Sequence, residues 1–336
     1  MQKTIFVVDD SLSNLSLAEE ALEKHYRVIT LSSAKKMYST LDKIKPDLIL
    51  LDIAMPDESG FDVMKVLKTS NHHSDIPVIF LSALTDTFNE ALGIELGAVD
   101  FITKPFSEPV LLNRVRNHIQ IDDIIRERTT QLMRMKDSIV STMSSIVESR
   151  DKFTSGHIER ITVFLKTLLD AMMAFGLYKD ELSEWDLESF VSSARLHDVG
   201  KNCVPESILN KAGSLTDEEF DIVKKHTTEG EKIVAQMINQ TGEAEFLHSA
   251  KLIAAYHHER WDGKGYPYGL SGEEIPLAGR LMALIDVYDA LVSDRPYRDA
   301  MSHDEAVSTI TKESGKQFDP QIVDIFNRIN KQFILN

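Results

Sequence analysis

Short apolar runs alternate with longer amphipathic stretches over the first 106 residues of the chain. The apolar runs have the length and composition of buried strands, and they occupy residues 4–8, 27–31, 47–52, 76–82 and 98–103. The amphipathic stretches are typical of helices and lie near residues 13–24, 34–44, 59–69 and 86–96. Strands that alternate with helices predict a parallel sheet covered by helices on both faces. We therefore expect an α/β doubly wound five-stranded parallel sheet in this part of the chain.

The pattern changes after this region, because apolar positions then recur mainly at helical spacing. The longest amphipathic segments are "ESFVSSARLHDVGKN", "LTDEEFDIVKKHTTEGEKIVAQM", "LHSAKLIAAYHHERWDG" and "LAGRLMALIDVYDALVSD". Thr216, followed three residues later by Glu219, predicts a capped start for the second of these helices. The pattern predicts an α/β region over the first 106 residues, a helical connector from Ser107 to about Arg150 and an almost entirely helical region over the last 190 residues.

The connector from Ser107 to about Arg150 contains no glycine, and no proline after Pro109. An apolar residue recurs there every seven positions, at Ile125, Leu132, Ile139 and Ile146. This repeat fits a helical seam between two copies of the chain, although the positions between them (Arg128, Met135, Thr142) suit a seam poorly. The same stripe, widened by Met133, Val140 and Val147, also fits packing against the chain's own C-terminal domain. Both interpretations stand at the level of sequence.

Composition narrows the classes of partner and compartment. The chain of 336 residues has a formal net charge of −16, which disfavours binding to nucleic-acid polymers. A small anionic substrate would need a locally positive site. Cys203 is the single cysteine, so an intramolecular disulfide is excluded and a reducing compartment such as the cytoplasm fits. The sequence shows neither a signal peptide nor an apolar run of 18 residues, so we expect no membrane span.

Polar residues follow the predicted strands of the first domain. Taken singly, each could cap a helix, begin a turn or carry a surface charge. The carboxyl ends of parallel strands meet at one edge of a sheet, however, so these side chains are expected to converge. The residues are Asp9, Asp10, Asp52, Ser82 and Lys104. Clustered carboxylates suit a hard divalent cation such as Mg²⁺, and a carboxylate beside that ion can accept a phosphoryl group.

These residues lie in motifs that resemble the receiver domain of two-component response regulators. The motifs are "VVDD", "LLDIAMPDESGFD", "LSA" and "ITKPF", in the usual order and spacing over about the first 120 residues. The resemblance implies that Asp52 is the phosphoacceptor and that a sensor histidine kinase is a partner. It also implies that Asp9, Asp10 and the Ala54 carbonyl hold Mg²⁺, that Ser82 and Lys104 contact the phosphoryl group, and that Phe101 is the switch aromatic.

Histidines gather in the all-α region. A single helical histidine is usually structural or solvated, and a His-Asp pair can be a cap or an ion pair. The combined set is harder to explain in this way, because unpaired charge inside apolar helices is costly. Its members are His197, Asp198, His226, His257, His258 and Asp286. Imidazole and carboxylate ligands without thiolate favour Fe, Mn, Zn, Co or Ni.

The histidine doublet is followed by the loop "DGKGYPYGL". Its glycines permit a close approach of the backbone to a ligand, and Pro267 fixes the turn. Tyr266 offers a ring on which a base could stack. A plain helix–helix connector is the alternative, but a connector does not account for the two histidines beside it.

The same region resembles the HD-GYP family of phosphohydrolases from about Met143 to the C-terminus. Together the two resemblances imply a receiver domain over 1–120, a helical linker over 121–142 and an HD-GYP metal-dependent phosphohydrolase domain over 143–336. The matching stretches are "RDKFTSGHIER", "LHDVGK", "KAGSLTDEEF", "HTTEG", "HHERWDGKGYPYGLSGEEIP" and "DVYDALVSDRPYR". The resemblance implies a helical domain with a two- or three-metal centre, often of iron. It implies hydrolysis of a cyclic dinucleotide, either cyclic di-GMP or 3′,3′-cyclic GMP-AMP. The alternatives are a non-catalytic receptor for such a nucleotide and a hydrolase of another nucleotide.

The resemblance also assigns roles to residues. One ion is expected on His197, Asp198 and Asp286, and the other on Asp198, His226, His257 and His258. Lys201 is expected to contact the scissile phosphate, and Gly265, Tyr266 and Pro267 to shape the substrate pocket. Arg295 and Arg298 match positions that bind the second phosphate, with surface pairing to Asp294 and Asp299 as the alternative.

One position departs from part of the family. Phe153 stands four residues before His157, where some members carry a glutamate that helps to hold a third ion. A phenyl ring cannot ligate a metal, so we expect two divalent transition-metal ions, with His157 near the pocket but not required as a strong ligand. The alternative is that Glu148 or Asp151 restores the third site.

Overall fold

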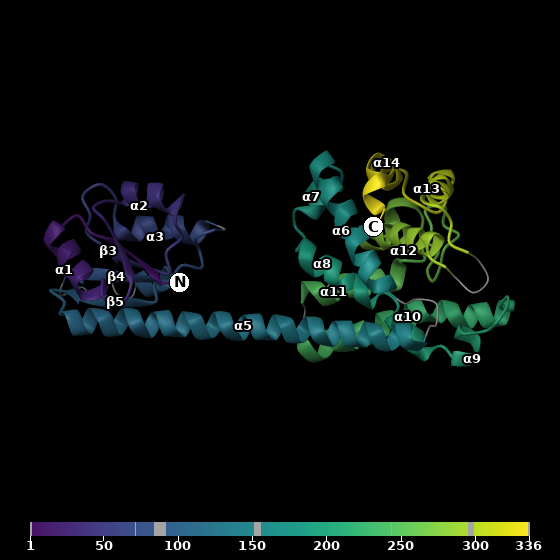
Figure 1. The fold of residues 1–336 in the computed structure, drawn as a ribbon, viewed down its shortest axis with the longest axis horizontal. Coiled ribbons are helices and arrows are strands. Elements are labelled where there is room, and N and C mark those ends of the chain that lie inside the picture. The colour runs from purple at the N-terminus through teal and green to yellow at the C-terminus, as the bar shows by residue number, and fades with distance from the viewer. Residues whose placement is uncertain are drawn as a thin grey trace. The chain divides into compact units, whose positions relative to one another are not determined.

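The computed structural model describes residues 2–70, 72–83, 92–150, 156–242, 244–294 and 299–334. The chain divides into two compact units, Met1–Leu132 and Met133–Asn336, each of which is described by itself. Figure 1 shows the fold of both units and labels most of their helices and strands.

The first unit is built on a five-stranded sheet in the order β2-β1-β3-β4-β5, with every neighbouring pair parallel. The strands are β1 (Thr4–Val8), β2 (Arg27–Leu31), β3 (Leu48–Asp52), β4 (Val78–Ala83) and β5 (Asp100–Lys104). The predicted fold class is therefore confirmed. The chain leaves β1 toward β2 on one side and returns to β3 on the other, which opens a crevice at the carboxyl ends of β1 and β3.

Both faces of this sheet are covered, as Figure 1 shows. Successive strand residues point to opposite faces, so each strand contributes to two cores. Val7 of β1 packs with Leu15 of α1 (Leu12–Leu22) and Val115 of α5 (Glu108–Arg150). Phe6 and Val8 face the opposite core, which is covered by α2 (Ala34–Leu41) and α3 (Gly60–Thr69). The helix expected near 86–96 lies largely outside the described residues.

The second unit is helical, and its described part contains isolated bridges but no extended strand. Its α-helices are α6 (His157–Phe175), α7 (Lys179–Leu182), α8 (Leu187–Ser193), α9 (Glu206–Leu209), α10 (Asp217–Thr241), α11 (Glu245–Tyr256), α12 (Leu277–Val292), α13 (His303–Lys312) and α14 (Pro320–Ile329). Short 3₁₀ turns are η1 (Ala194–Leu196), η2 (Val199–Cys203), η3 (Gly272–Glu274) and η4 (Asn330–Phe333). Thr216 and Glu219 form the predicted capping box of α10.

The main core of this unit lies between α6, α12 and α14 and includes Phe164, Tyr288 and Phe326. α12 is buried on nearly all sides, which matches its almost continuous apolar sequence. Among the described residues, no helix combines the length and apolar character that crossing a membrane would need.

The C-terminal half of α5 shows both faces that the linker pattern allowed. Val140 and Val147 are 2% and 7% exposed, and Val140 packs with Leu196 in the second unit. Ile139 and Ile146 are 47% and 52% exposed. Adjacent helical residues point about 100° apart. One stripe of the helix therefore packs on its own domain, and the neighbouring seven-residue stripe remains open.

Candidate functional site

Acidic side chains meet at the carboxyl edge of the sheet in the first unit. Asp52 ends β3, Asp9 directly follows β1, and both are buried. Carboxylate oxygens of Asp9, Asp10 and Asp52 all lie within 4.8 Å of one another. Lys104 at the end of β5 places its Nζ 2.7 Å from an oxygen of Asp9 and 2.7 Å from one of Asp52. The sheet topology thus brings together residues that are nearly 100 positions apart in sequence.

The surroundings of Asp52 shift the pKa of its carboxyl group. Burial raises the pKa of Asp52 and outweighs the opposing effect of Lys104. The backbone N–H of Ala54 donates to Asp52 Oδ1, with the nitrogen 3.3 Å from that oxygen. Ser82 is buried near the end of β4. A cation added among the three carboxylates would relieve their mutual repulsion, so the donor set fits Mg²⁺. The Phe101 ring lies 5.5 Å from that of Phe80.

The second unit gathers the predicted metal ligands from several elements. His197 and Asp198 join η1 to η2, His226 lies on α10, and His257 and His258 follow α11. Ligand atoms fall into two groups, each within 4.8 Å: His226 with His257 and His258, and His157 with His197 and Asp198. The first group contains three residues that were predicted to share an ion. The second contains His157, which was expected near the pocket without a strong ligand role.

Gly200 allows η2 and α10 to pack closely enough for Asp198 and His226 to share one site. A Cβ atom on Gly200 would lie 1.9 Å from the backbone oxygen of His226. Any larger residue would force the two elements apart. The close approach brings Asp198 and His226 to the same site.

The histidine rings are held in the orientation that metal ligands need. Their Nδ1 atoms lie 2.9 Å from the Ala194 oxygen for His197, 2.7 Å from the Val223 oxygen for His226, 2.9 Å from the Ile253 oxygen for His257 and 2.7 Å from Asp289 Oδ2 for His157. Carbonyl and carboxylate oxygens only accept, so each Nδ1 carries the proton and donates it. The unprotonated Nε2 is left to face the centre, which is the usual arrangement around a protein-bound metal.

Distances between these free nitrogens match a coordination sphere. Nε2 of His157 lies 3.3 Å from Nε2 of His197, and the same distance separates Nε2 of His226 and His257. Two nitrogens bound about 2.0–2.1 Å from one tetrahedral ion would be separated by about this distance. Two unprotonated ring nitrogens that face each other cannot form a hydrogen bond, and their lone pairs repel. Their close approach therefore fits a cation held between them.

Asp198 lies between the two groups. Its Oδ2 is 3.1 Å from His197 Nε2, and its Oδ1 is 3.4 Å from His226 Nε2. Oδ1 is buried and has no hydrogen-bond partner among the residues that the structure describes. A buried carboxylate oxygen without a donor is costly. The residues present therefore fit divalent ions, and Asp198 would be able to ligate an ion in either group.

Electrostatics favour the ligand forms of His226, His257, His258 and Asp198. Burial lowers the pKa of His197, but the adjacent Asp198 carboxylate outweighs burial and raises it, so a cation at this position would replace a proton. Burial, together with the neighbouring His226 and His197, lowers the pKa of His257 to about 3. Burial also lowers the pKa of His226 and holds that of His258 well below its usual range. For Asp198, burial opposes ionisation, but Lys201 and His197 hold its pKa well below the usual range. Neutral imidazoles and an ionised carboxylate are the forms that bind metals.

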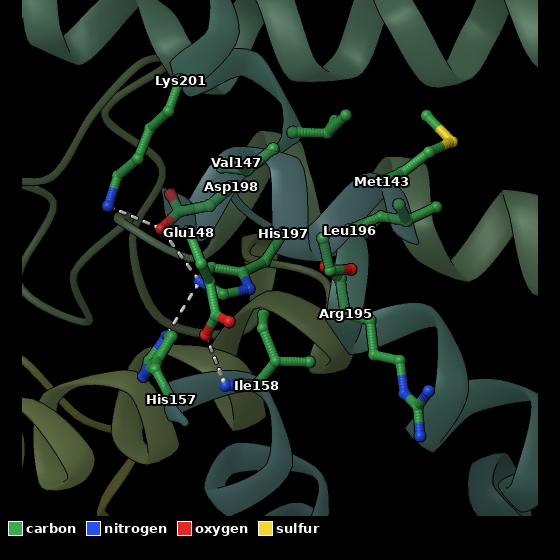
Figure 2. Close-up of a pocket in the computed structure, with 12 residues that line it drawn as sticks. Met143, Val147, Glu148, His157, Ile158, Arg195, Leu196, His197, Asp198 and Lys201 are labelled. Carbon is green, nitrogen blue, oxygen red and sulfur yellow. Dashed lines mark hydrogen bonds and ion pairs between the residues drawn. The ribbon is translucent and has the colours of Figure 1, made fainter. Parts of the chain in front are cut away.

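Figure 2 shows the edge of this site that faces α5. The His197 imidazole faces both Asp198 and His157, and Lys201 Nζ lies 2.7 Å from Asp198 Oδ2. Asp286, predicted to share an ion with His197, places its Oδ1 3.5 Å from His157 Nε2. Arg295, Arg298 and Phe153 lie outside the described residues.

The Gly-Tyr-Pro loop is placed against the histidine doublet. The ring of Tyr266 lies 4.8 Å from that of His258, and its backbone N–H donates to the His258 oxygen at 3.2 Å. A Cβ atom on Gly265 would lie 2.4 Å from the Arg260 nitrogen, so the chain can fold back here only with glycine. Pro267 follows in the same turn.

Three residues that sequence reasoning did not assign support the site. Asp289 holds His157 through its Nδ1. Glu259 is 2% exposed and accepts from three backbone N–H groups, those of Tyr268, Gly269 and Leu270. Glu148, weighed earlier only as a metal ligand, accepts from the Ile158 N–H at 3.1 Å. Glu259 could have been noticed, because it directly follows the histidine doublet in a buried segment.

Comparison with known proteins agrees with both halves of this structure. The receiver domain of response regulators matches residues 5–116, and the HD domain matches residues 141–322. A probable cyclic di-GMP phosphodiesterase of Vibrio cholerae is 39% identical, over 99% of this chain and 79% of the relative. The cyclic di-GMP phosphodiesterase response regulator RpfG of Xanthomonas campestris is 31% identical, over 96% of this chain and 87% of the relative.

A third relative resembles the C-terminal part. It is a 3′3′-cGAMP-specific phosphodiesterase of Vibrio cholerae, 34% identical over 58% of this chain and 35% of the relative. The acidic site at the sheet edge and the buried histidine centre correspond to the two matched domains in turn. The chain belongs to the family of two-component response regulators that join an N-terminal receiver domain to a C-terminal HD-GYP domain.

Proposed function

We propose that this protein hydrolyses a cyclic dinucleotide, cyclic di-GMP or 3′,3′-cyclic GMP-AMP, to the linear dinucleotide, under the control of receiver phosphorylation. One observation carries the catalytic part. Four histidines present unprotonated Nε2 atoms around Asp198, whose Oδ1 has no hydrogen-bond donor in the described part of the chain. The relatives named for this activity make a cyclic dinucleotide the substrate that fits best.

Two ions would be held by His197, Asp198 and Asp286 on one side and by Asp198, His226, His257 and His258 on the other. His157 is oriented to join the first set. When bound, such ions supply an activated water and neutralise charge on the reacting phosphate. Iron is the metal expected first, with Mn, Ni, Co or Zn as other occupants of an imidazole and carboxylate site.

Lys201 would donate to a non-bridging oxygen of the scissile phosphate. Its ammonium group already lies beside Asp198, so it is directed toward the place where charge develops. A fixed cation at that place stabilises the transition state more than the ground state. Lys201 also provides part of the positive charge that an acidic chain needs in order to bind an anion.

The Gly-Tyr-Pro loop would position the rest of the substrate. Tyr266 presents a half-buried ring next to His258, where a base could stack. Gly265 and Pro267 fix the path of the backbone around that ring. Arg295 and Arg298 are proposed to bind the second phosphate.

The direct test is incubation of metal-loaded protein with cyclic di-GMP and with 3′,3′-cyclic GMP-AMP, followed by chromatography of the products. We expect the linear dinucleotide to form in the presence of metal, and no product to form in reactions that contain a chelator. Tight binding without any product would instead support a receptor, and turnover of other nucleotides alone would support a different hydrolase.

We further propose that a sensor kinase or a small phosphodonor phosphorylates Asp52 in the presence of Mg²⁺. Asp9, Asp10 and the Ala54 carbonyl would hold the ion, and Ser82 and Lys104 would contact the phosphoryl group. Intact-mass measurement should show one labile phosphate on the wild type and none on Asp52→Asn. Equal modification of both proteins would remove Asp52 from this role.

A further inference from the structure

The last two turns of α5 contact the catalytic segments through polar groups. Ser144 is 3% exposed, and its hydroxyl lies 2.8 Å from the Arg195 carbonyl oxygen and 2.9 Å from that of Val140. Arg195 lies two residues before His197. The Ser144 hydroxyl therefore links α5 directly to the turn that carries His197 and Asp198.

Glu148, one helical turn further along α5, makes the second contact. Its Oε1 accepts from the backbone N–H of Ile158 at 3.1 Å, as Figure 2 shows. This N–H belongs to the first turn of α6, whose N-cap residue, Gly156, has no side chain to satisfy such groups. Ile158 directly follows His157. Glu148 therefore ties α5 to the start of the helix that presents His157.

Arg150 makes the third contact. Its Nη1 donates to the Asn202 oxygen at 2.6 Å, and its Nη2 donates to the Val204 oxygen at 3.2 Å. Asn202 directly follows Lys201 in η2. In return, the Asn210 side chain donates to the Arg150 oxygen at 2.7 Å. The end of α5 is thus joined to the segment that carries the proposed phosphate-binding lysine.

We propose that Ser144, Glu148 and Arg150 are positioning residues, and that through them α5 sets the spacing of the site and transmits the state of the receiver to it. The proposal rests on the function proposed above. Each contact falls within two residues of a different site residue, namely His197, His157 and Lys201. The three residues share one helix, so a rotation or shift of that helix would move all three segments together.

The course of α5 gives this helix a signalling role. It starts at Glu108, four residues after Lys104, and continues without a break to Arg150. Lys104 lies against Asp52, the proposed phosphoacceptor. A small movement at the start of a helix can be delivered at its far end, and a displacement of about 1 Å in a catalytic group can cost on the order of 100-fold in rate.

Glu148 gives the sharpest test, because two substitutions separate its hydrogen bond from its charge. Glu148→Gln keeps an oxygen that can accept from Ile158, whereas Glu148→Ala removes it. We expect Glu148→Ala to lower kcat by about 10- to 100-fold with little change in KM, and Glu148→Gln to restore most of that loss. The exposed Glu159→Gln, one residue beyond Ile158, is the matched control and should behave as wild type.

Ser144→Ala is the second variant, and the exposed neighbour Ser145→Ala is its control. Each protein is assayed with and without Asp52 phosphorylation by a small phosphodonor. We expect the rates of phosphorylated and unphosphorylated wild type to differ. The difference should shrink in Ser144→Ala and in Glu148→Ala but persist in both controls.

Metal release to a competing chelator provides a readout that does not depend on turnover. We expect faster release from Glu148→Ala than from Glu148→Gln or wild type, because His157 loses its fixed position. If wild type hydrolyses no cyclic dinucleotide, the proposed function fails, while this measurement still tests the positioning role.

Three results would overturn the proposal. Wild-type rates and metal release in Ser144→Ala and Glu148→Ala would show that these contacts position nothing. Equal losses in Glu148→Gln and Glu148→Ala would show that the charge acts directly on the metal or substrate. Equal wild-type rates with and without phosphorylation of Asp52 would refute transmission through α5.

Discussion

At the scale of single residues, the site depends on what holds each imidazole as well as on the imidazoles themselves. His197, His226 and His257 use backbone carbonyls of their own helices or turns, three or four residues earlier. His157 uses the carboxylate of Asp289, more than 100 positions away, and Asp289 also binds Arg160. The first three orientations follow from local helix geometry, and the fourth requires tertiary contact.

Metal ligation and phosphate binding should separate by mutation. His197→Ala or Asp198→Ala should abolish turnover and lower the metal content, because each removes a ligand atom from the centre. Lys201→Ala should keep its metal and lose about 100-fold or more in kcat, because it removes only a donor to developing charge. Elemental analysis beside steady-state kinetics measures both quantities. Full activity of metal-loaded His197→Ala would refute the ligand assignment.

Glu259 should act on substrate positioning rather than on the metals. It satisfies three backbone N–H groups just after the Gly-Tyr-Pro turn, and Glu259→Gln would place an amide donor against one of them. We expect KM for the cyclic dinucleotide to rise about 10-fold. Hydrolysis of a small phosphodiester, bis(p-nitrophenyl) phosphate, should change little. The exposed Glu273→Gln is the control, and equal losses on both substrates would contradict this role.

At the scale of elements, α5 carries two apolar stripes with different fates. Val140 and Val147 are buried against the helical unit, whereas Ile125, Leu132 and Ile139 are 57%, 66% and 47% exposed. Large apolar side chains that remain exposed at a seven-residue period are typical of a helix that pairs with another helix. The residues of the seven-residue repeat therefore form the exposed stripe of α5. The residues directly after Ile139 and Ile146, which are Val140 and Val147, belong to the buried stripe.

We expect two copies of the chain to associate along the open stripe. Leu132→Lys combined with Ile139→Lys places charges in that seam and should shift the protein to monomers. Sedimentation velocity over a concentration series measures this change. Gln131→Lys, which adds a charge beside the stripe, is the control. A wild-type protein that stays monomeric at every concentration would contradict the expectation.

At the scale of the whole molecule, the helical unit begins within α5. The second unit starts at Met133, and the HD domain match starts at residue 141. Val140 packs with Leu196, the residue directly before His197. The linker helix is therefore part of the fold that holds the metal centre as well as a connection to the receiver.

Truncation tests this boundary. A fragment of residues 133–336 should fold and bind metal, whereas a fragment of residues 156–336 loses Val140 and Val147 from the core. Each buried valine contributes about 1.5–3 kcal/mol, so the shorter fragment should have a markedly lower Tm and less metal. Thermal unfolding and elemental analysis measure the two effects. Equal Tm and metal content in both fragments would show that α5 is dispensable for the helical unit.

The sequence alone determined the parts of this protein that depend on local pattern. Strand-helix alternation predicted the five-stranded parallel sheet, because apolar periodicity reflects burial on both faces. The topology rule for parallel sheets then predicted that Asp9, Asp52 and Lys104 would meet, and they do. The spacing and type of the histidines predicted a metal-binding helical domain.

Tertiary structure decided what the local pattern left open. The seven-residue stripe could not reveal which face of α5 is buried, because Val140 and Ile139 are equally apolar and differ only in what lies opposite them. The grouping of His157 with His197 and Asp198 depends on Asp289 and Glu148, and each of these contacts joins two different helices. Local periodicity reports which residues are buried, whereas contact between distant side chains depends on how the helices pack.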